Sequence, residues 1–372
     1  MLEKEVLLRQ TAAALQARTA QLATPRAVLG FDGFVDEIVR IVDKRESLDR
    51  YTALPSLTAL ADRIAEAAGK STNLELVVQQ MKLGGNGPIM ANALAAFGVA
   101  VTYIGNLGYP TLHPVFQELA RRAQVISIAE PGHTDAIEFE DGKLMLGKIT
   151  PLNDITWENL MARVSGEQLL RFLQEAGLLG LLNWTMIPHL SDIWQHFLKD
   201  LCPLLKHRPL MFFDLADPAK RLTEDIHAAL QLLSRFQQYA DVMLGVNEKE
   251  SYELAEVLGI HVKYQTPEAV EKIAVEMRAK LGIGAVVVHP REYAVAATED
   301  EFARVTGPFT PKPLISTGGG DHFNAGFCLG ALLQLPLASC LLTGVATSGF
   351  YVRTAQSPTV DQLVEFIRHW PE

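Results

Sequence analysis

The chain of 372 residues carries 33 basic and 43 acidic side chains, and 48% of its residues are hydrophobic. A net charge of −10 without a long Lys/Arg run argues against binding nucleic acid or a membrane surface through bulk charge. The three cysteines share no CxxC spacing, so a disulfide framework is not expected. The N-terminus lacks the order of a signal peptide and the apolar runs are too short to span a bilayer, so we expect a cytoplasmic protein.

The first quarter of the chain alternates helical and extended segments. In chain order, we predict a helix at residues 3–22, strands at 26–31 and 34–42, a helix at 54–69, a strand at 74–80, a glycine loop at 82–88 and a helix at 89–98. The last of these helices ends at Gly98. The following segment, "VAVTYIGNLG", is a strand that runs into a glycine turn.

Later strands are apolar throughout and follow helical segments, as in residues 177–185 and 209–216. Such strands imply a parallel sheet that helices cover on both faces. Residues 133–149 instead alternate around Asp141-Gly142, which predicts a hairpin. We therefore expect one α/β domain over residues 1–372, with a doubly wound, mostly parallel Rossmann-like sheet. A small β lid is expected from residues 33–48 and 133–150.

Two early motifs place polar groups where ligands of such sheets bind, beyond the carboxyl ends of the strands. "GFDGFVDEIV" puts Asp32 and Asp36 after a buried strand, where carboxylates can accept hydrogen bonds from sugar hydroxyls. In "KLGGNGP", Gly84 and Gly85 let the backbone approach a ligand, and Asn86 offers side-chain hydrogen bonds. The alternative is ordinary turn chemistry, for which Asp, Asn and Gly are common.

"GVNEKE" places Asn247 and Glu250 after another strand. An N-x-x-E pair at a helix start can hold Mg²⁺ through water, because this ion prefers oxygen ligands and keeps much of its hydration. The alternative is a helix N-terminus that Asn caps and Glu stabilises through the macrodipole. Taken alone, the motif favours the alternative.

"STGGGDHFNAGF" (residues 316–327) is more specific. Glycines at a helix N-terminus leave several N–H groups converging, and with the helix dipole they form an anion site. Phosphoryl transfer needs such a site and gains from a base beside the attacking hydroxyl. Here the run Gly318–Gly320 provides the anion hole and Asp321 provides the candidate base.

These motifs together resemble the PfkB (ribokinase-like) family of carbohydrate and nucleoside kinases. The paired glycines, the N-x-x-E segment and the late glycine run with its Asp occur in the family's order. "DLADPAKR" (214–221) and "GVATSGFYVRTAQSPT" (344–359) are similar to further family segments, and the resemblance covers residues 26–370. It implies a Rossmann-like core with a β lid over the substrate.

The resemblance also implies a role for each motif residue. The base is Asp321, and the anion hole is Gly318, Gly319 and Gly320. The magnesium–phosphate motif is Asn247 and Glu250, with Mg²⁺ bound through water and no direct protein ligand. The sugar-contacting positions are Asp36, Gly84 and Gly85, to which Asp32 and Asn86 are added from their own chemistry.

The sequence departs from the family pattern at three positions. Ile89 replaces a common Asn of the glycine loop, and "GGNGPIMAN" is similar to the ADP-dependent sugar-kinase branch. Ile315 stands where an Asp often supports a monovalent-cation site, which argues against potassium activation. His289, in "VVVHPREY", replaces a glycine-rich segment and is a candidate phosphate contact on the nucleotide side.

The sequence thus predicts a sugar kinase that uses Mg-ATP, with a small sugar and a nucleotide as its binding partners. The alternatives are a nucleoside kinase, an ADP-dependent sugar kinase, and a non-catalytic sugar- or nucleotide-binding protein on the same fold. The open edges of the lid strands also suggest a homodimer that forms through the lid.

Overall fold

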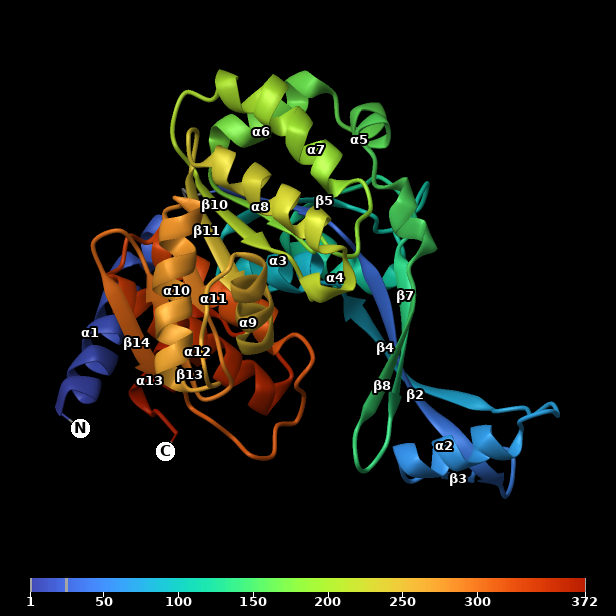
Figure 1. Ribbon diagram of the computed structural model, residues 1–372. Coiled ribbons are helices and arrows are strands. Elements are labelled where there is room, and N and C mark those ends of the chain that lie inside the picture. The colour runs from blue at the N-terminus through green and yellow to red at the C-terminus, as the bar shows by residue number, and fades with distance from the viewer. Residues whose placement is uncertain (1, 24–25, 372) are drawn as a thin grey trace.

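A computed structural model describes residues 2–23 and 26–371 and contains two sheets (Figure 1). The larger sheet has the strand order β14-β13-β12-β11-β10-β9-β1-β5-β6, and its pairs are parallel from β12 to β6. At one edge, β13 pairs in antiparallel fashion with both β12 and β14. The strands are β1 (Arg26–Phe31), β5 (Ala100–Gly105), β6 (Gln124–Ser127), β9 (Ala176–Leu182), β10 (Leu210–Asp214), β11 (Asp241–Val246), β12 (Ala285–Val288), β13 (Tyr293–Ala297) and β14 (Phe302–Thr306).

Helices cover both faces of this sheet because successive strand residues point to opposite sides. In β11, Val242 and Leu244 pack into one apolar cluster and Met243 packs into the other. The first cluster takes side chains from α5 (Trp157–Arg163), α6 (Gly166–Glu175), α7 (Leu190–His196), α8 (Thr223–Phe236), α9 (Glu248–Val257) and α10 (Pro267–Leu281). The second takes side chains from α1 (Leu2–Arg18), α3 (Asn86–Ala96), α4 (Gln117–Arg122), α11 (Gly319–Leu332), α12 (Leu337–Thr354) and α13 (Val360–Arg368).

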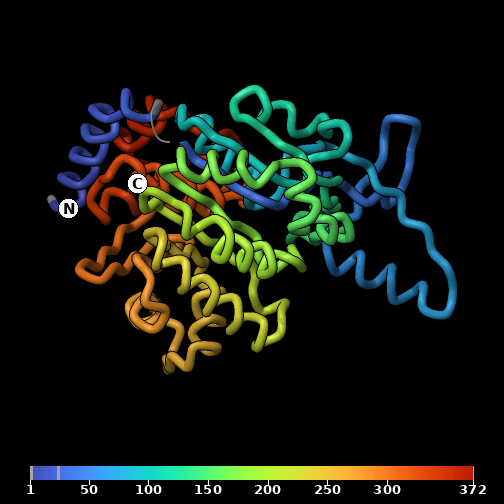
Figure 2. The backbone as a smooth tube through the Cα atoms, turned by 90° about the horizontal axis from the view of Figure 1, so that it is seen from above, coloured from blue at the N-terminus to red at the C-terminus, as the bar shows by residue number. Residues whose placement is uncertain are grey.

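The smaller sheet, the lid, projects from one end of this core, as Figure 2 shows from above. Its long central strand β2 (Phe34–Arg45) pairs in parallel with β7 (Gly132–Glu138) and in antiparallel fashion with β3 (Tyr51–Ala53) and β4 (Leu76–Gly84). The last strand, β8 (Lys143–Lys148), forms the expected hairpin with β7. Helix α2 (Leu57–Glu66) packs Leu60 against one face of this sheet.

The predicted fold class is confirmed, whereas two local predictions were wrong. The segment "KLGGNGP" is not a loop: β4 continues through Gly84 because Phe34 pairs with it, and α3 begins two residues later at Asn86. The first helix ends at Arg18 and a 3-10 helix follows over Thr19–Ala23. In the ranges 2–23 and 26–371, none of the helices combines the length and the apolar character that crossing a bilayer requires.

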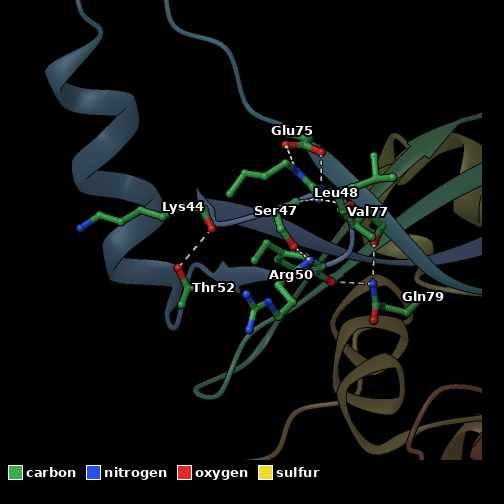
Figure 3. A network of polar contacts seen from close by, with 10 residues as sticks. Lys44, Ser47, Leu48, Arg50, Thr52, Glu75, Val77 and Gln79 are labelled. Atoms are coloured by element: carbon green, nitrogen blue, oxygen red, sulfur yellow. Dashed lines mark hydrogen bonds and ion pairs between the residues drawn. The ribbon is translucent and has the colours of Figure 1, made fainter.

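Side-chain hydrogen bonds tie the strands together at the far end of the lid (Figure 3). The guanidinium of Arg45 pairs with the carboxylate of Glu75, just before β4. Gln79 Nε2 on β4 donates to the hydroxyl of Tyr51 on β3 at 2.8 Å. These groups are exposed, so their stabilising effect is small and the contacts mainly define the shape of this end.

Helices α11 and α12 pack so closely that glycine is required between them. A Cβ atom on Gly326 would lie 2.4 Å from Thr347 Oγ1 and 2.5 Å from the Thr343 carbonyl oxygen. We expect Gly326→Ala to lower the free energy of unfolding by about 1–3 kcal/mol through overpacking. Denaturant unfolding measures this loss. The matched variant is Gly166→Ala, at the exposed start of α6, where a Cβ would meet only Met161 Sδ at an ordinary contact distance of 3.9 Å. It should leave the free energy of unfolding unchanged, and equal stability of both variants would contradict the packing argument.

Candidate active site

The sequence motifs gather at one edge of the large sheet, where its parallel strands end. Asp32 follows β1, Asn183 follows β9, Asn247 follows β11 and His289 follows β12. Ligands of doubly wound sheets bind at this edge. The lid begins here too, since only Asp32 and Gly33 separate β1 from β2. The lid therefore borders the candidate site.

Two cavities meet at this edge. The first, which we call the lid cavity, has a volume of about 550 Å³ and is lined among others by Phe34, Asp36, Asn86, Thr134, Met145 and Asp321. The second, the glycine-loop cavity, has a volume of about 660 Å³ and is lined among others by Asn247, His289, Ser316, Gly319, Gly320 and Val352. Thr317 lines both cavities, so it marks the point where they meet.

Asp321 lies in the first turn of α11 and faces the lid cavity, where its side chain is 9% exposed. Burial raises the pKa of this carboxyl well above its ordinary value, and the nearby carboxylates of Asp214 and Asp32 raise it further. A hydrogen bond with the Asn86 side chain acts in the opposite direction. A buried carboxyl with a raised pKa beside a cavity has the properties of a general base.

The three glycines before Asp321 occupy different positions relative to the helix start and the glycine-loop cavity. Gly318 caps the helix with φ +91°, and its carbonyl accepts hydrogen bonds from the His322 backbone and ring at 3.0 and 2.7 Å. Gly319 and Gly320 line the glycine-loop cavity, although the Gly319 N–H already donates to the Ser316 carbonyl at 3.2 Å. Gly320 is in the first helical turn, whose N–H groups lack intrahelical partners. The structure therefore brings two of the three predicted glycines to the cavity.

Asn247 and Glu250 form a capping box at the start of α9. Asn247 Oδ1 accepts from the Glu250 N–H at 3.0 Å, and Glu250 Oε2 accepts from the Asn247 N–H at 2.9 Å. Glu250 Oε1 accepts a third bond from the Asp217 N–H at 2.8 Å. Each carboxylate oxygen thus keeps a lone pair, and Glu250 faces the lid cavity while Asn247 faces the glycine-loop cavity.

His289 stands beside the glycines, with its ring 4.7 Å from the ring of Phe323. Burial lowers the pKa of His289 to about 4. The imidazole is therefore neutral at pH 7. It can offer a hydrogen bond to a phosphate in the glycine-loop cavity, but it cannot offer a positive charge.

The predicted sugar-contacting residues separate into two groups. Asp36, Gly85 and Asn86 line the lid cavity, and Gly84 packs so closely on Asp36 that a Cβ there would lie 2.3 Å from Asp36 Oδ1. Asp32 is fully buried and lines neither cavity. It sits below the site, where Oδ1 accepts from the Gly87 N–H at 2.9 Å and Oδ2 from Asn183 Nδ2 at 2.8 Å. Its geometry is that of a support for the glycine loop.

Sequence reasoning missed three cavity-lining residues with unusual backbone. Asn183, Ala216 and Asp217 all have φ between 58° and 60°, a left-handed conformation that is uncommon outside glycine, and all three line the lid cavity. Strained backbone of this kind concentrates at functional sites. Asn183 also keeps a buried Oδ1 without a hydrogen-bond partner among the described residues. Their position directly after β9 and β10 was the available signal.

Comparison with known proteins indicates the family to which a chain with this site belongs. A model of the prokaryotic ketohexokinase family matches residues 6–370. A ketohexokinase from Haloferax volcanii is 31% identical over 347 residues, which cover 92% of this chain and 90% of that protein. A 5-dehydro-2-deoxygluconokinase from Clostridium botulinum is 29% identical over 140 residues, which cover 36% of this chain and 39% of that protein.

Solved structures show the same fold at lower identity. Arabidopsis thaliana ribokinase, complexed with ribose and ATP, aligns with a TM-score of 0.64 and 16% identity over 93% of this chain and 99% of that chain. A phosphofructokinase-2 variant from Escherichia coli aligns with a TM-score of 0.65 and 15% identity over the same shares. These likenesses support the ribokinase-like fold, and the family match over residues 6–370 goes further. The chain is a PfkB-type sugar kinase and belongs to the prokaryotic ketohexokinase family.

Proposed function

We propose that the protein transfers the γ-phosphate of ATP to a hydroxyl group of a small ketose held in the lid cavity. The observation that carries this proposal is the start of α11. Its Asp321 faces the lid cavity, and Gly319 and Gly320 face the glycine-loop cavity. One helix terminus thus presents a base to the acceptor and the Gly320 N–H to the phosphate.

In the proposed reaction the sugar lies under the lid with its hydroxyl beside Asp321. The carboxylate takes the hydroxyl proton as the oxygen attacks the γ-phosphorus in line. Charge on the phosphoryl oxygens is stabilised by the Gly320 N–H and the positive end of the α11 dipole. The raised pKa of Asp321 suits a base that must hold the proton near neutral pH.

We propose that Asn247 and Glu250 hold the hydration shell of the nucleotide's Mg²⁺. The side-chain oxygens of both residues each retain a lone pair after the capping-box bonds. Asn247 lines the glycine-loop cavity and Glu250 lines the lid cavity, so the pair borders both. The bound ion would neutralise charge on the phosphates.

The lid cavity favours a sugar over a nucleoside as acceptor. Its polar walls include Asp36, Asn86 and Thr134, which can bond hydroxyl groups, and Phe34 is its sole aromatic wall in the described ranges. A nucleoside base would need a stacking platform. The family match favours a ketohexose in particular.

A coupled kinase assay tests the acceptor and the donor together. Ketohexoses, aldohexoses, pentoses, sugar phosphates and nucleosides would each be offered with Mg-ATP and with Mg-ADP. We expect the highest kcat/KM for a ketohexose with ATP. A faster nucleoside would contradict the acceptor, activity with ADP alone would contradict the donor, and calorimetric binding without product would indicate a non-catalytic binding protein.

We further propose that two copies associate through the lid. Met81 on β4 and Leu146 on β8 are apolar but 47% and 45% exposed, and these two strands form opposite edges of the lid sheet. An exposed apolar side chain on each open edge strand favours pairing with a second copy over contact with solvent. Light scattering should give the mass of a dimer for the wild type and of a monomer for Leu146→Lys. A monomeric wild type would contradict this association.

A further inference from the structure

A lysine of the lid reaches the loop that joins the two cavities. Lys143 is the first residue of β8, and its Nζ donates a hydrogen bond to Oγ1 of Thr317, 174 positions later in the chain. The ammonium group of Lys143 is thus bonded to an uncharged hydroxyl group. Thr317 directly precedes the glycine run and lines both cavities. The ammonium group therefore lies at the boundary between the acceptor and the phosphate donor.

The pleat of the lid explains this position. Along β8, Lys143, Met145 and Gly147 lie on one face of the strand, and Met145 and Gly147 line the lid cavity. Lys148 points to the opposite face, where it pairs with Asp135 at 3.0 Å. The neighbouring lid strands place Lys82 opposite Asp36. The inner face of the lid thus carries two lysines above a cavity whose floor is acidic.

Phosphoryl transfer calls for positive charge at this boundary. The transferred group carries negative charge on its three equatorial oxygens, and cationic clamps stabilise it. The other cations beside the cavities are poorly placed to supply this charge. Lys82 lies opposite the carboxylate of Asp36, which attracts its ammonium group. Lys220 is paired with Asp217 at 3.1 Å, and Arg291 is exposed at the rim. His289 is neutral at pH 7 because burial lowers its pKa to about 4.

We infer that Lys143 is the lid's cation for phosphoryl transfer: held at Thr317, its ammonium group faces the transferred phosphoryl group and offsets the charge that develops on its oxygens. This inference rests on the proposed kinase function. The ammonium keeps its protons throughout, because the hydroxyl proton goes to Asp321. The bond from phosphorus to the donor oxygen breaks and the bond to the sugar oxygen forms. A lid that supplies this charge also makes turnover depend on lid closure over the sugar.

Steady-state kinetics of Lys143→Met test this inference with the ketohexose and Mg-ATP. We expect kcat to fall about 10²–10³-fold, as when one stabilising donor of a transition state is lost. KM for the sugar should stay close to the wild-type value, since the contact strengthens in the transition state. Lys143→Arg keeps the charge and should recover most of the lost turnover. Thr317→Val removes only the resting partner of the ammonium and should lose much less.

The matched control is Lys148→Met, which removes a lysine from the same strand but from the outer face. It should retain wild-type kcat. A second readout is inhibition by Mg-ADP with aluminium fluoride and sugar, a mimic of the planar transferred group, which should weaken for Lys143→Met by the same factor as kcat/KM. Wild-type turnover in Lys143→Met, or an equal loss in Lys148→Met, would overturn the inference while leaving the kinase proposal intact. A wild type without any phosphoryl transfer would instead overturn the proposed function.

Discussion

Replacing Asp321 by Asn should lower kcat by about 10²–10⁴-fold, the usual contribution of a positioned general base. The amide has nearly the same shape as the carboxylate but cannot take the proton of the sugar hydroxyl. The fold should survive the change, because burial already disfavours the charged form of this side chain and raises its pKa. Sugar and nucleotide binding, measured by calorimetry, should therefore persist while turnover is lost.

The control for this variant is Asp217→Asn. Asp217 lines the same cavity, but its carboxylate is partly exposed and pairs with Lys220 and Lys249 at 3.1 and 2.6 Å. Its left-handed backbone tolerates Asn. We expect this control to keep most of its turnover. Unchanged phosphorylation by Asp321→Asn would rule out Asp321 as the base.

The pH dependence of kcat/KM follows from the same carboxyl. A base must be deprotonated to act, and the pKa of Asp321 lies well above that of an ordinary Asp in the unliganded enzyme. Activity should therefore rise with pH through this raised pKa, and the acid limb should lie at higher pH than an ordinary carboxyl would give. In Asp321→Asn the residual rate should lose this limb. An acid limb at the ordinary carboxyl pKa would contradict the buried environment.

The sequence was sufficient to predict that most candidate site residues lie at the strand ends along one edge of the sheet, because strand ends and glycine runs leave local signals. Asp321 and Asn247 follow directly from a glycine run and an apolar strand. The same signals could not separate Asp32 from Asp36, since both follow β1 and only packing decides which one reaches the cavity. Lys143 left no signal at all. The role that we infer for it depends on a contact with Thr317, 174 positions later in the chain, which follows from how the lid lies over the core.

The antiparallel edge of the large sheet was unpredictable for a related reason. Residues of β13 are as apolar as those of a buried parallel strand, because α10 and α12 cover its two faces. Strand direction is set by the short connection from β12, which four residues make. A parallel pair would need a crossover connection of a dozen residues or more. The apolar character of β13 does not indicate how long the connection before it is, so it could not predict the direction of the strand.

Replacing Asp32 should lower stability, whereas replacing Asp36 should lower kcat/KM for the sugar. Asp32→Ala removes the acceptor of two buried donors, the Gly87 N–H and the Asn183 amide. We expect a loss of about 2–4 kcal/mol in the free energy of unfolding. Asp36→Ala instead removes a charged acceptor from the cavity wall, so kcat/KM for the sugar should fall about 10- to 100-fold with little change in stability.

The pH dependence of stability separates the two carboxylates further. Burial raises the pKa of Asp32 to about 6 from 3.8, so the folded state binds the proton more tightly than the unfolded state does. The resulting stability is present below the unfolded pKa and is lost as pH rises through the folded value. The difference in stability between the wild type and Asp32→Ala should therefore shrink from acid to neutral pH. Denaturant unfolding at several pH values measures it. The contrary result would be an Asp32→Ala variant that keeps wild-type stability but loses sugar binding as fully as Asp36→Ala does. Asp32 would then be a direct sugar contact. If Asp32 only supports the glycine loop from below, its replacement should weaken sugar binding only together with stability.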